Sequence, residues 1–237
     1  MLPRFVVLAI SLMGALLLDN AFAEEPLVRE SRPVANVSAV SLKGSGDVVI
    51  TQGNKEELVV EAQKSVLPKI STEVDNGTLS LSMKSGTFHF GKDPKIRYYL
   101  TVKQLNKIAL AGSGDIRAAS LNADKLDIVT SGSGDVRIDS LSAQEINVRI
   151  SGSSGVKLAG KVNSQSIKIA GSGDYGSPEL RSGAASIAIA GSGDATLWAT
   201  DALSISIAGS GDVKYYGQPK VSQSVAGSGA VQGLGAK

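Results

Sequence analysis

The chain has 237 residues, enough for one large domain or two small ones, and its 42% hydrophobic and 19% charged residues are typical of a folded protein. It has no cysteine and one histidine, which excludes disulfide scaffolds, thiolate metal sites, cysteine nucleophiles and histidine-rich catalysis. Its 24 basic residues nearly balance 22 acidic ones, whereas phosphate binding needs a concentrated basic patch. We therefore expect no nucleic-acid partner.

The first 23 residues have the three parts of a secretory signal peptide. Arg4 precedes an apolar run from Phe5 to Leu18, and the small-residue ending Ala21-Phe22-Ala23 follows. The run is about fourteen residues long, short of the roughly twenty that a permanent membrane helix needs. We expect residues 1–23 to be cleaved, which leaves an exported chain, periplasmic or secreted, without a membrane span.

A short glycine-rich motif recurs along the chain. The tetrapeptide Gly-Ser-Gly-Asp, or a close variant, begins at Gly44, Gly112, Gly132, Gly152, Gly171, Gly191, Gly209 and Gly227. From Gly112 onward the motifs follow one another at nearly constant intervals, each of about eighteen to twenty positions. A period of this length and regularity indicates stacked structural repeats.

The residues around each motif alternate with a period of two, which is typical of β-strands. Aliphatic side chains mostly occupy the positions four and two before the first glycine, as in Ile187 and Ile189, and another often lies four after it, as in Val136. Glycine suits the corner between the two strands because it adopts positive backbone angles without strain. The pattern predicts an all-β right-handed parallel β-helix, a solenoid of about ten coils. A two-sheet sandwich of hairpins is the alternative.

The segment between Gly44 and Gly112 departs from the repeat, because it spans a little over three coil lengths without the motif. Asp75-Asn76-Gly77 is a strong hairpin signal between two alternating runs, and residues Arg97 to Val102 form another expected strand. We expect one domain over residues 24–237, with irregular coils in 34–107 and regular coils in 108–231. The irregular part would cover the end of the stack, where unpaired backbone invites aggregation.

Several of these segments, in this order, resemble a known family. They are VSLKGSGDVVIT from Val40 to Thr51, then Leu58 to Ala62, then Leu67 to Ile70, then the Asp75-Asn76-Gly77 turn, and finally the Gly-Ser-Gly-Asp series. Together they are similar to the DUF2807 family, labelled the putative auto-transporter adhesin, head GIN domain. The resemblance spans roughly residues 34–231. It implies an exported bacterial β-helical domain without catalytic residues, so we expect a non-enzymatic binding or scaffold module of the cell envelope.

The fourth motif position forms a series of aspartates that stacking would bring into a column: Asp47, Asp115, Asp135, Asp174, Asp194 and Asp212. Carboxylates about 4.8 Å apart repel by roughly 1 kcal/mol per pair in water. We expect each aspartate to bond the backbone of its own corner. Basic residues two positions later would offset the repulsion; they are Arg117, Arg137, Lys157 and Lys214.

Two other roles for the aspartates remain open. Gly- and Asp-rich β-rolls bind calcium, but they use a nine-residue repeat that is absent here, so we expect no metal and no cofactor. A polysaccharide-active enzyme, lyase or glycosidase-like, is the alternative function, since carboxylates one or two coils apart match glycosidase spacings. Any stacked column has those spacings, and catalysis needs one carboxyl whose surroundings differ from the other's.

Two aromatic residues are candidates for recognition. Trp198 and Tyr216 both lie seven residues after the first glycine of their motif and would stack, with Leu234 next in the column. If they face outward, they are candidate binding residues for an envelope glycan or protein; the alternative is that a bend turns them into the core. His89 is expected to be an outward strand residue, since a metal site needs further ligands.

Overall fold

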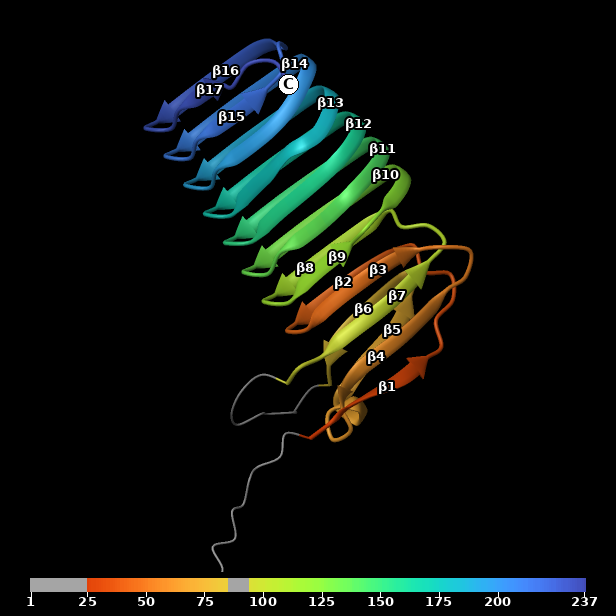
Figure 1. The fold of residues 1–237 in the computed structure, drawn as a ribbon. Coiled ribbons are helices and arrows are strands. Elements are labelled where there is room, and N and C mark those ends of the chain that lie inside the picture. Colours follow the sequence, from red (N-terminus) through yellow and green to blue (C-terminus); the bar gives the residue numbers. More distant parts are fainter. Residues whose placement is uncertain (1–24, 85–93) are drawn as a thin grey trace, which may run out of the picture.

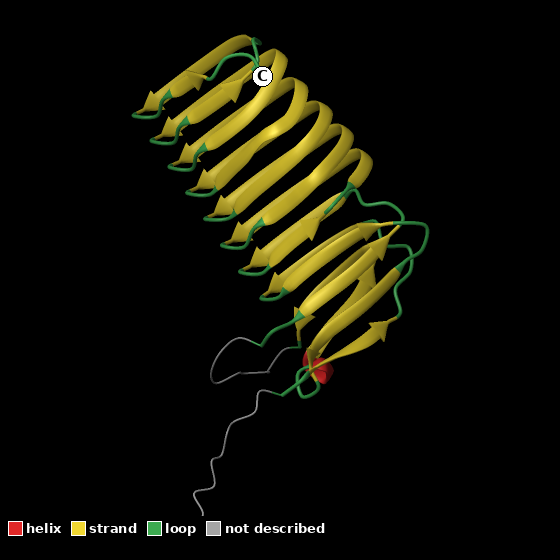
Figure 2. Cartoon of the chain, viewed as in Figure 1, coloured by secondary structure: helices red, strands yellow, loops and turns green. Residues whose placement is uncertain are grey.

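The computed structural model describes residues 25–84 and 94–237, and the fold is a long stack of β-strands (Figures 1 and 2). The expected signal peptide and His89 lie outside the described residues. One short 3₁₀ helix, η1 (Leu67–Lys69), precedes the first hairpin. The N-terminal strands are β1 (Leu27–Arg32), β2 (Ala39–Gly44), β3 (Asp47–Gln52), β4 (Glu57–Gln63), β5 (Ile70–Asp75), β6 (Thr78–Met83) and β7 (Arg97–Val102).

The remaining strands build the regular part of the stack. They are β8 (Lys107–Gly112), β9 (Asp115–Ala118), β10 (Leu121–Gly132), β11 (Val136–Gly152), β12 (Gly155–Gly171), β13 (Asp174–Gly191), β14 (Ala195–Gly209), β15 (Val213–Tyr216), β16 (Lys220–Gly227) and β17 (Val231–Gly233). Each long strand runs smoothly around the bend that lies opposite the glycine corners (Figure 1). The strands of neighbouring coils pair in parallel throughout this part.

The glycine corners lie one above another, as the sequence predicts. The first glycine of each motif is the register partner of the next, from Gly112 through to Gly227. Gly44 pairs with Gly112 in the same way, although the whole irregular segment separates them in sequence. The parallel β-solenoid is therefore confirmed. It makes about six turns, so the prediction of about ten coils is too high.

The excess came from the irregular segment, which does not wind into three further coils. After β3 the chain reverses into β4, which is antiparallel to β7, and then into β5, which is antiparallel to β6. β6 and β7 pair in parallel with β2 and β3 on the side away from β8 and β9. The first corner therefore lies between a later segment on one side and the regular coils on the other.

The hairpin signal and the expected strand near residue 100 are both confirmed. β5 and β6 flank Asn76 and Gly77, whose φ angles of 47° and 75° are the positive values that a tight two-residue turn requires. Residues Arg97–Val102 form β7 as expected. β1 adds an antiparallel strand on β4, so antiparallel strands cover this end of the stack.

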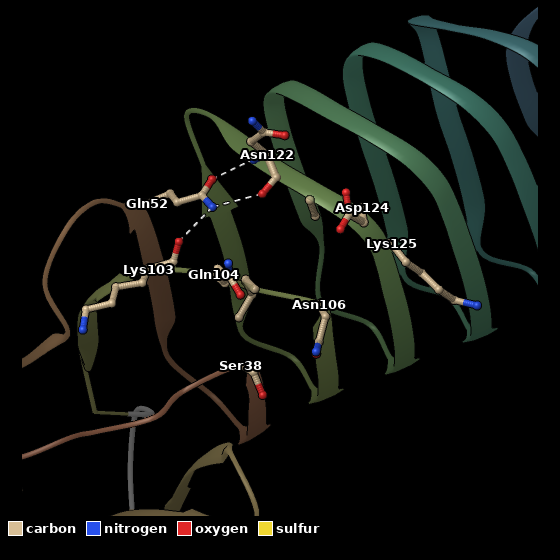
Figure 3. Close-up of a pocket in the computed structure, with 10 residues that line it drawn as sticks. Ser38, Gln52, Lys103, Gln104, Asn106, Asn122, Asp124 and Lys125 are labelled. Atoms are coloured by element: carbon tan, nitrogen blue, oxygen red, sulfur yellow. Dashed lines mark hydrogen bonds between the residues drawn. The ribbon is translucent and has the colours of Figure 1, made fainter.

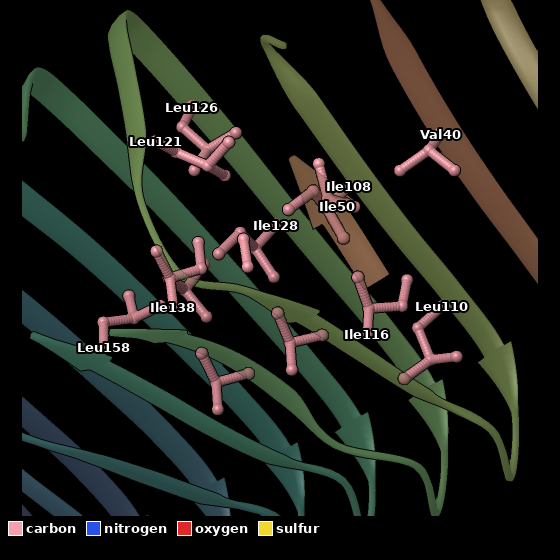
Figure 4. Packing of buried hydrophobic residues seen from close by; sticks show 14 of the residues in the cluster. Val40, Ile50, Ile108, Leu110, Ile116, Leu121, Leu126, Ile128, Ile138 and Leu158 are labelled. Atoms are coloured by element: carbon pink, nitrogen blue, oxygen red, sulfur yellow. The ribbon is translucent and has the colours of Figure 1, made fainter. Parts of the chain in front are cut away.

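One hydrophobic core runs through the molecule from Val37 to Val213. The expected inward positions are buried in the coils from β8 to β14; for example, Ile187 and Ile189 are 1% and 2% exposed, whereas those of the last coil, in β16, are exposed. Figure 4 shows equivalent aliphatic side chains of neighbouring coils packed against one another. Alternation along the strands thus places these residues inside and leaves the polar ones on the two faces and the bends.

Close stacking at the corners explains why they need glycine. Gly112 has a φ of +140°, and a Cβ atom there would lie 2.2 Å from the carbonyl oxygen of Gly44. At Gly114 the corresponding distance to the oxygen of Gly46 is 2.0 Å. Any side chain at these positions would push the coils apart, so the motif is a packing requirement.

Candidate binding surface

A column of outward residues follows the bend opposite the glycine corners. Register partners in successive coils define this bend column: Asn122, Ser142, Lys161, Arg181, Trp198 and Tyr216. Its first four side chains are exposed and its two aromatic side chains are half-buried. The column therefore changes from polar, through cationic, to aromatic toward the C-terminal end.

Trp198 and Tyr216 face outward and lie side by side. Trp198 lies between the buried residues Leu197 and Ala199, so alternation along β14 turns its ring away from the core. Tyr216 is its register partner on β15. Of the two arrangements considered from the sequence, the structure therefore shows the outward one.

Cationic groups flank the two rings. The Lys237 Nζ atom lies 4.9 Å from the centroid of Tyr216 and 5.5 Å from that of Trp198, while the Arg181 guanidinium lies 5.9 Å from Trp198. Arg181, Trp198 and Lys237 line a cleft of about 450 Å³ together with Thr200, Gly217 and Gln218. We call Arg181, Trp198, Tyr216 and Lys237 the aromatic platform.

Buried hydrogen bonds fix the backbone that carries Trp198. Ser182 donates its hydroxyl to the Trp198 carbonyl at 2.8 Å, and the Gln165 amide donates to that hydroxyl oxygen at 2.8 Å. Tyr175 reaches across the interior and donates to the Gln165 Oε1 atom, also at 2.8 Å. Burial raises the pKa of the Tyr175 phenol, so it remains a donor.

Two further hollows lie along the same edge of the solenoid. The larger, of about 520 Å³, lies where the N-terminal strands meet the regular coils, and Figure 3 shows the polar residues around it. They include Ser38, Asn106, Asp124 and Lys125. A second hollow of about 230 Å³ shares Asn122 to Asp124 with the first and continues over the next two coils.

Gln52 fixes the wall of the larger hollow. Its Nε2 atom donates to the carbonyls of Lys103 at 3.1 Å and Asn122 at 3.0 Å, and its Oε1 atom accepts from the Asn122 N–H at 2.7 Å (Figure 3). One amide thus joins the first coil, the connection before β8 and the start of β10. The hollow is preformed and presents amide, hydroxyl, carboxylate and ammonium groups.

Lys161 and Arg181 are adjacent cations in the middle of the bend column. They are direct register partners on β12 and β13, and both are exposed. Within residues 25–84 and 94–237, neither has an ion pair with a carboxylate. Cations one coil apart repel each other by roughly 1 kcal/mol in water, and a bound anion would relieve that repulsion.

The aspartate column is built differently from the prediction. Each of five carboxylates accepts the backbone N–H of the next coil at the equivalent corner, rather than one in its own corner, at distances of 2.8 to 3.1 Å. These five are Asp115, Asp135, Asp174, Asp194 and Asp212. The own-corner prediction was wrong because parallel stacking brings the N–H of the next coil within hydrogen-bond distance of each carboxylate. Asp47 instead lies 3.8 Å from Arg97.

The expected offsetting basic column forms only in part. Arg117 pairs with Asp115 at 3.0 Å, but Arg137 pairs with Asp139, two residues further on, at 2.6 Å. No ion pair within the described ranges joins Lys157 or Lys214 to the aspartates. Charge-assisted bonds to backbone N–H groups thus take the stabilising role that the sequence assigned to lysine and arginine.

The acidic column presents little that distinguishes one carboxylate from another. Its five bonded members accept the same kind of backbone hydrogen bond, and Asp115 also pairs with Arg117. Among the described residues no cluster of three or more acidic or histidine side chains could hold a metal ion. In the same part of the chain, no helix has the length and apolar character needed to cross a bilayer.

Several residues of this surface were not found from the sequence. Gln165 and Ser182 are polar residues at inward strand positions, a signal that comparison of the coils could have detected. Arg181 and Lys161 could have been found by aligning the coils on their far bends. Lys237 gave no signal, because its contact with Trp198 depends on how the last segment folds back.

Comparison with known proteins agrees with this architecture. A crystal structure of a putative adhesin from Bacteroides fragilis is 28% identical, with a TM-score of 0.81 over 89% of this chain and 98% of its own. Two other crystal structures share the fold. A putative lipid binding protein from Parabacteroides distasonis is 23% identical (TM-score 0.74, covering 88% of this chain and 97% of its own). A putative adhesin from Parabacteroides merdae is 19% identical (TM-score 0.70, covering 88% and 96%).

No match was found among proteins with curated descriptions. The family model described as "Putative auto-transporter adhesin, head GIN domain" matches residues 36–219, which is most of the chain and includes the corner series up to Asp212. The resemblance read from the sequence is thereby confirmed, and the chain belongs to the DUF2807 family.

Proposed function

We propose that this protein is an exported, non-enzymatic, adhesin-like module of the bacterial cell envelope that binds an acidic glycan along its bend column. The observation that carries the proposal is the sequence of side chains Lys161, Arg181, Trp198 and Tyr216 on four successive coils. Two cations without carboxylate partners among the described residues lie next to two outward aromatic rings.

The chemistry of this surface matches an acidic sugar polymer. Aromatic rings offer flat apolar faces for the C–H surface of a sugar ring, and the neighbouring cations fit carboxylate groups on the same ligand. The coils repeat every ~4.8 Å, so an extended polymer along the column would meet equivalent positions repeatedly. The polar hollows at the other end of the column supply amides and hydroxyls for further sugar units.

Retention on immobilised polygalacturonate, with neutral dextran as reference, tests the binding role. We expect the chain to be retained by the acidic polymer, and Trp198→Ala or Arg181→Ala to lower the affinity at least about tenfold, which is ~1.4 kcal/mol. Arg149 and Lys168 supply the control, since they are adjacent exposed cations on a flat face. Equal losses of affinity in Arg149→Ala and Arg181→Ala would show that only unspecific charge attraction holds the polymer, which would contradict the proposal.

Export has its own test. The proposed export depends on residues 1–23, and the family to which the chain belongs carries an adhesin description. Amino-terminal sequencing of the product recovered from the periplasm or medium should begin at Glu24. Recovery of a product beginning at Met1 would contradict cleavage of the segment.

A further inference from the structure

The outer edge of the last coil is an unusual strand. β16 (Lys220–Gly227) pairs with β14 on one side, and no described strand pairs with its other side. All eight of its residues are exposed, including Val221 and Val225, which are each 39% exposed. Their partners in the preceding coil, Leu203 and Ile207, are buried, so the apolar interior continues to an uncovered surface.

This edge lacks the features that continue the stack or protect a free edge. Ala230 stands where the preceding coil has Asp212, so the corner has no carboxylate to accept the N–H of a further coil. Between Val221 and Gly227 there is no charge, proline or bulge, which are the usual devices against edge pairing. Such a strand has the unpaired backbone groups that pair with another strand.

The sequence of β16 is self-complementary. Residues 221–225 read Val-Ser-Gln-Ser-Val, the same in both directions. In an antiparallel pair of identical strands related by a twofold axis at Gln223, Val221 lies opposite Val225 of the second copy. Opposite residues point to the same side, so valines meet valines inside and serines meet serines outside.

We propose that two copies of this protein pair end to end through β16, antiparallel and centred on Gln223. The two Gln223 amides then face each other on the axis and can exchange hydrogen bonds, a polar contact that fixes the register as a single polar residue does in a coiled coil. Lys220 lies opposite Ala226 of the second copy, so the two lysines are kept apart. The interior is closed at both C-terminal ends by one shared interface.

The opposite end of the molecule fits this edge less well. The strands with free edges there, β1 and β5, carry the charges of Arg29, Glu30, Arg32, Glu73 and Asp75. Head-to-tail stacking would place the uncharged β16 against these groups and partly desolvate them, while β16 offers no charged partner of its own. Tail-to-tail pairing also closes, whereas head-to-tail stacking would continue into a fibre.

A charge-swap experiment at Gln223 tests this arrangement. Sedimentation of residues 24–237 should show a concentration-dependent dimer. Gln223→Lys and Gln223→Glu should each be monomeric, because like charges meet on the axis, and an equal mixture of the two should dimerise again. Ser206→Lys is the control, on the outward side of β14 one coil away, and it should dimerise like the wild type.

Cysteine cross-linking gives a second readout in a chain that has no cysteine. Gln223→Cys should form a covalent dimer on mild oxidation, since opposite positions of antiparallel strands lie within disulfide range. Ser206→Cys should not. A wild-type chain that stays monomeric at every concentration would overturn the proposal, as would charge variants that dimerise separately or a mixture that fails to dimerise.

Discussion

The Oδ1 atom of Asp135 accepts a hydrogen bond from the backbone N–H of Gly155, one coil further along, at 2.8 Å. This bond replaces a carbonyl: where the motif has Gly155 instead of aspartate, the N–H of Asp174 bonds to the backbone oxygen of Ser154 at 3.0 Å. The carboxylates therefore continue the parallel hydrogen-bond ladder through each corner. The aspartate side chain thus takes the place of a backbone carbonyl as the hydrogen-bond acceptor at the corner.

Removing one such carboxylate should weaken the stack. Asp194→Ala leaves the N–H of Asp212 without its acceptor, which should lower the free energy of unfolding by about 1 kcal/mol in urea titrations. Asp194→Asn keeps an acceptor oxygen and should recover much of the loss. Asp47→Ala, whose exposed carboxylate lies 3.8 Å from Arg97, should change stability by less than about 0.5 kcal/mol. Equal losses for Asp194→Ala and Asp47→Ala would contradict this role.

Thr130 and Ser154 are expected to be a compensating pair. Ser154 occupies a position that is glycine in the other corners, and at Gly173 and Gly193 a Cβ would meet the residue two before the first glycine of the coil below. For Gly173 the residue below is Ile150, whose Cγ2 atom would lie 2.5 Å from the added Cβ. For Ser154 the residue at the same position of the coil below is the smaller Thr130. Both hydroxyls are buried without a hydrogen-bond partner in the described structure.

Thr130→Ile should therefore destabilise the protein by about 1–3 kcal/mol through overpacking. Combining it with Ser154→Gly should restore stability to at least the wild-type level, since the double variant has the packing of the other corners. Thr130→Val, which keeps the volume and removes a buried hydroxyl, should cost little. A double-mutant cycle measured by urea unfolding gives the coupling, and additive effects would show that the two residues do not interact.

Gln165 should control both stability and the position of the platform. Gln165→Leu removes one hydrogen-bond partner from each of the hydroxyls of Tyr175 and Ser182, so we expect the free energy of unfolding to fall by about 1–3 kcal/mol. Because Trp198 is the single tryptophan, intrinsic fluorescence reports on the platform alone, and its emission should shift in this variant. Gln144→Leu, at an exposed position of the bend, is the matched control. Unchanged emission in Gln165→Leu would show that the network does not position the ring.

Glu61 should make stability depend on acid pH. A hydrogen bond from Arg29, at 2.5 Å, is the main cause that holds the pKa of Glu61 below its usual range, and Arg97 adds to it. A lowered carboxyl pKa gives stability that is present above the ordinary value of about 4.3 and is lost as the pH falls through the folded-state pKa. Glu61→Gln should unfold earlier than wild type at neutral pH.

The two unfolding curves should converge as the solution is acidified, as measured by urea midpoints across a pH series. Glu57→Gln, on the same strand but in an exposed pair with Lys55, should follow the wild type throughout. A constant gap between Glu61→Gln and wild type at every pH would contradict the assigned cause.

The regular part of the fold was predictable because each copy of the repeat places the same kinds of residue at the same positions of its coil. Once Gly112 to Gly227 recur at nearly constant spacing, the inward isoleucines follow from alternation alone. The order of coils at the N-terminal end was not predictable, since nothing in the sequences of β6 and β7 indicates that these strands lie beneath the first corner. Hairpin signals show which strands are adjacent in sequence, but not on which side of a stack they lie.

The binding surface was predictable only in its aromatic part. Trp198 and its register partner Arg181 lie at different distances along the chain from the first glycine of their own motifs, because the coil that begins at Gly191 reaches the bend sooner than the coil that begins at Gly171. Counting residues from the first glycine of each motif therefore assigns different positions to residues that lie side by side at the bend. The acceptors of the aspartates were missed for a related reason, since spacing within one coil cannot distinguish its own N–H from that of the next.

Titration of Trp198 fluorescence with polygalacturonate shows whether the bend column is a site for acidic glycans. We expect a saturable change in emission that weakens as salt is raised, that is reduced in Lys161→Ala and Arg181→Ala, and that is unaltered in Arg149→Ala. Emission that stays constant up to saturating polymer, or that responds equally to neutral dextran, would contradict it.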